Sequence, residues 1–194
     1  MSGISIEKMA DKLATEPVLV SFPTDTVPAL ATRPENANLI YKAKQRPPEK
    51  PLILMGAALS QLLPYVSGST EELNTWRSLT QRHWPGQLTL VLPASPLTPP
   101  ELNPMGTGTI GIRVPNHPIA LDLLTRSGPL ATTSANLSGS PALTEPTSIA
   151  HTFPSALMLP PEAYKTQENS GTPSTVVKWT GLGWQVLRQG QITL

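Results

Sequence analysis

The stretch Tyr41-Lys-Ala-Lys-Gln-Arg-Pro-Pro-Glu-Lys-Pro-Leu52 joins the end of an expected helix to an apolar run, Leu52-Ile-Leu-Met55, that we expect to form a strand. Pro47 and Pro48 cannot continue a helix, and a residue that precedes proline is disfavoured in the α conformation. We therefore expect Lys44 and Arg46 to point from a helix end and an extended segment towards a common space. With Lys42 and Lys50, this segment, here called the cationic turn, holds four of only 14 Lys and Arg residues.

A stiff, positively charged turn suits a polyanion such as a triphosphate, because little conformational entropy remains to be lost on binding. The alternative is a solvated helix end whose lysines complement the helix dipole. Charge alone leaves both interpretations open.

Composition favours one globular domain spanning residues 1–194, with 39% hydrophobic residues and a net charge of +1. That charge gives no global electrostatic reason for binding nucleic acid or a membrane. Disulfides and thiolate metal sites are excluded because the chain has no cysteine. The amino terminus lacks a secretory apolar region, and no run approaches the ~18 apolar residues of a spanning helix, so we expect a cytoplasmic protein.

Apolar periodicity predicts an α/β fold with a mixed sheet. Ser5 is the expected N-cap of the first helix, which Pro17 closes. The expected helices cover residues 6–13, 35–44, 57–63, 71–83, 117–125 and 147–153. The expected strands cover residues 18–22, 52–55, 88–92, 109–114, 130–133, 156–159, 174–179 and 184–189. Residues 95–108, rich in proline, and residues 160–173 are expected loops, and either could close over a site.

Polar residues follow or line several of these strands. Pro23-Thr-Asp-Thr26 and Ser134-Ala-Asn-Leu-Ser-Gly139 each come directly after a strand, where ligands bind in open α/β sheets. Alternation in residues 109–114 places Thr109, Gly111 and Arg113 on one face, which we interpret as a ligand face. A capped turn in the first case and a surface strand in the last are the alternatives.

No Ser-His-Asp arrangement and no phosphate-binding loop of the Gly-x4-Gly-Lys-Ser/Thr type is found. His83, His117 and His151 are too scattered to indicate a metal site, and His117 is expected to begin a helix. Charge stabilisation and positioning, as in transfer at phosphorus, fit this inventory better than a histidine base.

Six segments together carry a resemblance to a known family: Pro23-Thr-Asp-Thr-Val27, Lys44-x-Arg46-Pro with Lys50-Pro-Leu52, Trp84-Pro-Gly86 with Leu88-Thr-Leu90, Thr109-Ile-Gly-Ile-Arg-Val-Pro-Asn-His-Pro118, Thr133-Ser-Ala-Asn-Leu-Ser-Gly139, and Ser174-Thr-Val-Val177 before Leu187-Arg188. The chain resembles the YrdC/Sua5 family of L-threonylcarbamoyladenylate synthases, most closely its short, single-domain form. The resemblance runs from about residue 17 to residue 190, and the Lys-x-Arg and Ser-x-Asn pairing is its signature.

The resemblance implies a twisted mixed sheet flanked by helices around a deep, positively charged cavity. It also implies an enzyme, a nucleotidyltransferase that condenses L-threonine, bicarbonate and ATP into threonylcarbamoyl-AMP and releases pyrophosphate, with Mg²⁺ accompanying the ATP. The product would serve the t6A modification of tRNA at adenosine 37, through a tRNA threonylcarbamoyl-transfer complex downstream.

Residue by residue, the resemblance implies catalytic roles for Lys44 and Arg46. It implies ATP contacts for Lys44, Arg46, Lys50, Thr109, Ser134, Asn136, Thr144 and Arg188. Threonine contacts would come from Thr24 or Thr26, Arg113 and Ser174, and no residue is expected to bind a metal. The family commonly has Tyr-Gly-Leu where this chain has Pro28-Ala29-Leu30, so one wall of the site is expected to differ.

Two other functions compete with this one. A non-catalytic module could bind double-stranded RNA or tRNA through the same basic surface, although no basic patch with interleaved aromatic residues supports it. A protein of the same fold could instead transfer carbamoyl from another donor, although such proteins usually carry further domains.

Overall fold

One mixed sheet organises the computed structural model, which describes residues 3–167 and 169–194. Residue 168, part of the expected loop at 160–173, lies outside the described residues. The strands run in the spatial order β7-β1-β2-β6-β3-β5-β4-β8-β9. Their bounds are β1 Leu19–Phe22, β2 Ala29–Thr32, β3 Ile53–Met55, β4 Leu88–Pro93, β5 Thr109–Arg113, β6 Leu130–Ser134, β7 Ala156–Met158, β8 Thr175–Trp179 and β9 Trp184–Arg188.

Parallel and antiparallel neighbours alternate irregularly across the sheet. The pairs β1–β7, β3–β5 and β4–β8 are parallel, and the others are antiparallel. The predicted mixed sheet and α/β class are therefore confirmed. No helix among the described residues has the length and apolar character needed to cross a bilayer.

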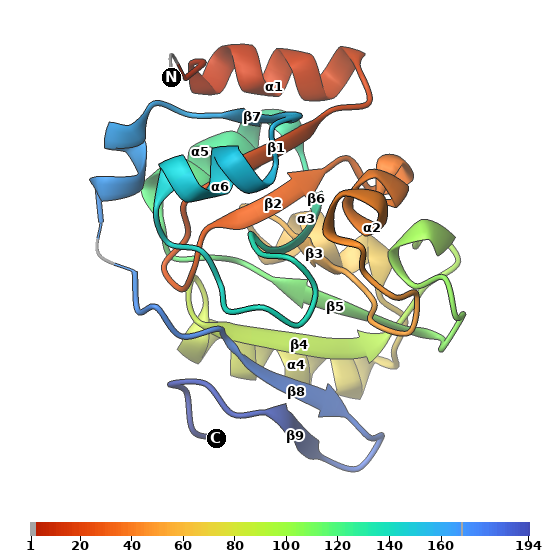
Figure 1. Cartoon of the computed structure of the whole chain (residues 1–194). Helices are drawn as coiled ribbons and strands as arrows, with labels where there is room; N and C mark the ends of the chain where they lie inside the picture. The colour runs from red at the N-terminus through yellow and green to blue at the C-terminus, as the bar shows by residue number, and fades with distance from the viewer. Residues whose placement is uncertain (1–2, 168) are drawn as a thin grey trace.

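Helices cover both faces of the sheet. Figure 1 shows α3, α4 and α5 behind it, α2 and α6 in front, and α1 along the end formed by β7 and β1. The α-helices are α1 Ile6–Thr15, α2 Asn38–Lys44, α3 Leu59–Leu62, α4 Thr70–His83, α5 Pro118–Ser127 and α6 Pro146–Thr152. The 3-10 helices are η1 Pro34–Asn36, η2 Leu63–Tyr65, η3 Pro100–Leu102 and η4 Pro161–Lys165. Two of these short turns, η3 and η4, lie inside the stretches that we expected to be loops.

Local sequence signals explain where the main helices start and stop. Ser5 caps α1 by accepting a hydrogen bond from the backbone of Lys8, as predicted. Ser69 and Glu72 form a reciprocal capping box at the start of α4. The second helix ends at Lys44 because Gln45 adopts the left-handed conformation, with φ of 51°. The cationic turn consequently leaves the helix sharply.

The strand β2 was not predicted. Its sequence, Ala-Leu-Ala-Thr, is short and carries little β-branched or aromatic character, so its local propensity for strand is weak. Every residue of β2 is buried, and the strand pairs with β1 on one side and β6 on the other. Tertiary pairing therefore determines this strand, and it brings the loop that contains Thr24 and Thr26 back towards β6.

Alternation along β5 separates the core from the face that carries the site. Ile110 and Ile112 are buried in the hydrophobic core, whereas Gly111 and Arg113 point to the opposite face. Trp179 on β8 lies on the core face too, in an edge-to-face contact with Trp76 of α4. The predicted ligand face of residues 109–114 is thus the face on which a cavity opens.

Candidate active site

A cavity of about 450 Å³ lies on this face of the sheet. Its floor follows the pairing register, because residues opposite one another on neighbouring strands point to the same side. The middle row of the floor consists of Lys178, Val91, Gly111, Ile53 and Thr132, each paired with the next. A Cβ at Gly111 would lie 2.8 Å from the Ile53 side chain, so a larger residue would clash there. Glycine therefore leaves space for a ligand above the centre of the floor.

Two further sets of residues flank the middle row. Towards the cationic turn, the cavity is lined by Arg46, Thr107, Thr109 and Ser134. Towards the loop after β1, it is lined by Thr26, Thr89, Arg113, Ser174 and Arg188. Segments far apart in the sequence therefore meet over one floor, with two groups of hydrogen-bonding and cationic side chains at its two ends.

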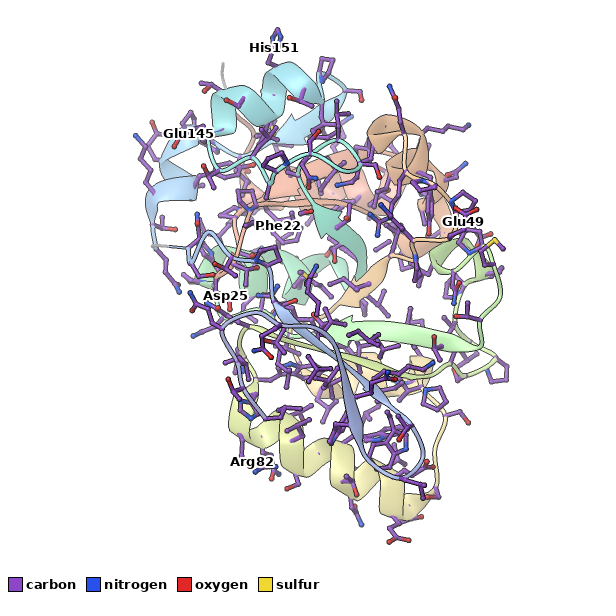
Figure 2. All side chains as sticks on the ribbon, turned by 60° about the horizontal axis from the view of Figure 1, so that its bottom comes forward. Phe22, Asp25, Glu49, Arg82, Glu145 and His151 are labelled. Atoms are coloured by element: carbon purple, nitrogen blue, oxygen red, sulfur yellow. The ribbon has the colours of Figure 1, made fainter. Side chains whose placement is uncertain are left out.

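The lining of the cavity is positively charged. Arg46, Arg113, Lys178 and Arg188 line it, and no carboxylate is among the described lining residues. Glu49, the acidic residue of the cationic turn, is exposed and lies at the outer edge of the molecule (Figure 2). Cations concentrated in a concave site without compensating acids favour anionic ligands.

Lys44 joins the cationic turn to the loop after β6. Its ammonium donates hydrogen bonds to the backbone oxygen of Ser134 and, at 3.4 Å, to Oδ1 of Asn136. The backbone oxygen of Lys44 accepts a hydrogen bond from the amide of Ser138, at 3.1 Å. Asn136 is itself held in place, because its Nδ2 donates hydrogen bonds to the backbone oxygens of Leu137 and Ser140. The Lys-x-Arg and Ser-x-Asn motifs therefore form one hydrogen-bonded unit.

Lys44 is only 1% exposed, and none of the salt bridges among the described residues involves it. Burial is the main cause that lowers its pKa to about 7, and the positive charge of Arg46 lowers it further. Near neutral pH this lysine therefore loses its proton far more readily than an exposed lysine does. A neighbouring anion would restore the charged form.

Arg46 is held by the turn itself. Its Nε donates to the backbone oxygen of Lys50 at 2.8 Å, and its Nη2 donates to that of Pro51 at 2.9 Å. Burial lowers the pKa of its guanidinium, although an arginine stays protonated in proteins. Two carbonyl contacts orient this guanidinium, which lines the cavity.

Arg113 ties β5 to the loop after β1. It is 3% exposed, and its Nη2 lies 2.7 Å from Oδ1 of Asp25. It also donates to Thr26 Oγ1 at 2.9 Å and to the backbone oxygen of Gly86 at 3.0 Å. Figure 2 shows Asp25 beside the segment that leads into β8, where the amide of Ser170 donates to its backbone oxygen. Burial lowers the pKa of Arg113, and the charge of Asp25 opposes this shift.

Ser174 is fixed directly before β8. Its hydroxyl lies 2.8 Å from that of Thr89, and its backbone oxygen accepts from Nε and Nη2 of Arg188 at 3.0 and 2.8 Å. Nη2 of Arg188 also lies 3.2 Å from the Ser174 hydroxyl. Arg188 therefore positions Ser174 as well as lining the cavity.

Some predicted site residues lie away from the cavity lining. Thr24 is buried and does not line the cavity; its hydroxyl donates to the backbone oxygen of Val27 and lies 3.0 Å from the hydroxyl of Thr26. Lys44 and Asn136 lie behind Ser134. Thr144 and Lys50 are exposed and do not line the cavity. No site role was predicted for four lining residues, Thr89, Thr132, Thr133 and Lys178, although Thr89 and Thr133 stand in segments that carry the family resemblance.

His117 is the N-cap residue of α5, as predicted, and it is fully buried. Neither ring nitrogen has a hydrogen-bond partner among the described residues. Burial lowers the pKa of His117, and the negative charge of Asp25 opposes this shift. Within residues 3–167 and 169–194, no group of three or more His, Asp or Glu residues could hold a metal ion. Because no carboxylate lines the cavity either, the described side chains do not fit a protein-bound Mg²⁺.

Fold and cavity together define an α/β protein with a preformed, cationic candidate ligand site, on the face of its mixed sheet opposite α4. The family model Sua5/YciO/YrdC, described as "Telomere recombination", matches residues 13–190. The chain belongs to this family.

Relatives agree with this assignment. The chain is 42% identical to a threonylcarbamoyl-AMP synthase of Bacillus subtilis over 146 residues, which cover 73% of this chain and 41% of the relative. It is 36% identical to that of Pyrococcus abyssi over 191 residues, covering 96% of this chain and 54% of the relative. The chain thus spans about half the length of these two relatives.

The crystal structure of P. abyssi Sua5 complexed with L-threonine superposes with a TM-score of 0.81 and 33% identity. The match covers 96% of this chain and 55% of the other. The shared architecture therefore extends over nearly the whole chain.

Proposed function

We propose that this chain is a threonylcarbamoyl-AMP synthase, a nucleotidyltransferase that uses L-threonine, bicarbonate and ATP. The observation that carries the proposal is the cavity, in which two polar, cationic ends share one floor and no described carboxylate repels an anion. Support comes from the names of the relatives and from the L-threonine complex of P. abyssi Sua5.

In the proposed reaction, the threonine amine first adds to bicarbonate and water leaves, which forms a carbamate. A carbamate oxygen then attacks the α-phosphorus of ATP, and the bond to the β-phosphate oxygen breaks to release pyrophosphate. Lys44, Arg46, Ser134 and Asn136 would hold the nucleotide and neutralise charge as it shifts to the leaving group. Three further nucleotide contacts are proposed, Thr109 and the exposed Lys50 and Thr144. Arg188 is a proposed nucleotide contact too, although it lines the end of the cavity that would hold threonine.

The other end of the cavity would hold threonine. Thr26, Arg113 and Ser174 would contact the amino acid or its carbamate, and Thr24 would support Thr26 from below. Arg113 already binds Asp25, Thr26 and Gly86, so its guanidinium is fixed before a substrate arrives. Fixed donors lose little entropy on binding, which favours catalysis by positioning.

Mg²⁺ belongs to the proposal as a companion of ATP, held by phosphate oxygens, because the described cavity offers no carboxylate ligands. We place the reaction in the cytoplasm, as a single-domain activity that supplies threonylcarbamoyl for t6A through a tRNA threonylcarbamoyl-transfer complex. The non-catalytic module for double-stranded RNA or tRNA is not favoured, since no aromatic residue on which bases could stack is among the described lining residues.

Pyrophosphate release from ATP tests the proposal directly. Purified protein is incubated with ATP while threonine and bicarbonate are each supplied or omitted. We expect release only when both are present. Release that ignores either compound, or no release from protein that binds ATP, would contradict the assigned reaction.

The lowered pKa of Lys44 predicts that ATP binding is coupled to the uptake of a proton by this side chain. Its pKa is about 7 in the free protein, and a bound triphosphate would raise it. Binding at pH 8 should therefore take up close to one proton, binding at pH 6 almost none, and affinity should fall as pH rises above 7. Calorimetry in buffers of different ionisation enthalpy measures the uptake.

The matched control is Lys44→Met. Any proton uptake that this variant shows comes from the nucleotide or from other groups, and it is subtracted from the wild-type value. Equal proton uptake by the wild type and this variant at pH 8 would show that Lys44 does not titrate on binding.

A further inference from the structure

Lys178 is a cavity residue to which neither the sequence motifs nor the proposed reaction gives a role. It lies on β8 and lines the cavity beside Val176, whereas Val177 and Trp179 point to the core face. Its aliphatic stem can lie along the floor while the ammonium reaches the open space. The register places it opposite Val91, at the end of the middle row.

The charge of Lys178 is not neutralised by its neighbours. Among the salt bridges of the described residues, none involves Lys178. Its partner across to β9 is Gln185, which is uncharged, and no carboxylate is among the described lining residues. An ammonium held over a cavity without an acidic partner is available to a bound anion.

The position of Lys178 indicates which anion that is. The middle row lies between the end lined by Thr109 and Ser134 and the end lined by Arg113 and Ser174. Arg46 enters from the segment before β3, and Lys178 enters from β8, with β5 and β4 between them. Three strand spacings place the backbones that carry these two residues roughly 14 Å apart. Two long side chains that extend towards each other over this distance can both contact one phosphate group.

We propose that Lys178 is a further phosphate-binding residue of this site, which contacts the nucleotide phosphates across the cavity from Arg46. The inference rests on the proposed function, because that reaction places the phosphates between the two ends of the floor. Lys178 would neutralise charge on the phosphates that leave as pyrophosphate.

Calorimetric titrations of ATP, pyrophosphate and L-threonine test this contact. Lys178→Gln should lower the affinities for ATP and for pyrophosphate about tenfold, which corresponds to the loss of one charge-assisted hydrogen bond. Lys178→Glu should lower these two affinities further, whereas the affinity of both variants for L-threonine should stay within about twofold of the wild-type value. Lys8→Gln, at an exposed lysine of α1, is the matched control and should change nothing.

The outcomes separate this inference from the proposed function. Unchanged ATP and pyrophosphate affinity in Lys178→Gln, or a loss confined to threonine, overturns the contact while the synthase assignment stands. Phosphate binding that depends on Lys178, in protein that never releases pyrophosphate, sustains the contact and overturns the assignment. A wild type that binds neither phosphate ligand overturns both.

Discussion

Lys44→Met is expected to lower kcat/KM for threonine-dependent pyrophosphate release by about 100- to 1000-fold, the size of effect seen when one preorganised donor to developing charge is lost. The ammonium is buried behind Ser134, where the surroundings screen its charge far less than water would. Methionine removes that charge and also the hydrogen bonds that hold the Lys-x-Arg and Ser-x-Asn motifs together.

Stability should respond much less than activity to this change. The folded protein lowers the pKa of Lys44, so protonation costs stability below about pH 7, and this cost disappears as pH rises from about 7 towards the unfolded value of 10.5. Methionine has a similar stem and no charge to desolvate. We therefore expect a Tm within a few degrees of that of the wild type.

The control is Lys42→Met, two residues earlier on the same helix, where the lysine is exposed. It should keep the wild-type rate and Tm. A Lys44→Met enzyme that retains more than about a tenth of the wild-type rate would mean that this ammonium does not stabilise the reacting phosphates.

The contrast between Lys44 and Lys42 shows how far the sequence could lead. Charge and proline spacing correctly predicted that the helix ends at Lys44 and that a cationic turn follows. They could not predict that Lys44 is buried, because its partners Ser134 and Asn136 are 90 and 92 residues away in the chain. Only the resemblance to a family linked these motifs before the structure did.

Lys178 and β2 illustrate two different reasons for missing a feature. Alternation in residues 174–179 contains the signal that puts Val176 and Lys178 on one face, but the sequence does not tell which face meets the site. In β2, by contrast, the residues Ala29 to Thr32 carry almost no local signal, and burial between β1 and β6 determines the strand. The site depends on both, since Ala29 and Lys178 line the same cavity.

Arg113→Met is expected to lower the free energy of unfolding by about 3–5 kcal/mol, because it leaves the Asp25 carboxylate buried without its cation. Asp25 depends on this partner, since its Oδ1 lies 2.7 Å from Arg113 and its Oδ2 has no partner among the described residues. The same guanidinium holds Thr26 and Gly86. Urea unfolding at pH 7 measures the loss.

The double variant Asp25→Asn/Arg113→Met distinguishes an unpaired charge from a general packing defect. Removing the carboxylate removes the charge that Arg113→Met leaves buried, so the double variant should be more stable than Arg113→Met alone. A packing defect would instead make the two losses additive. Activity should stay low in the double variant even where stability recovers, because the fixed guanidinium at the threonine end is gone. Recovery of threonine-dependent pyrophosphate release together with stability would show that Arg113 serves the fold and not the substrate.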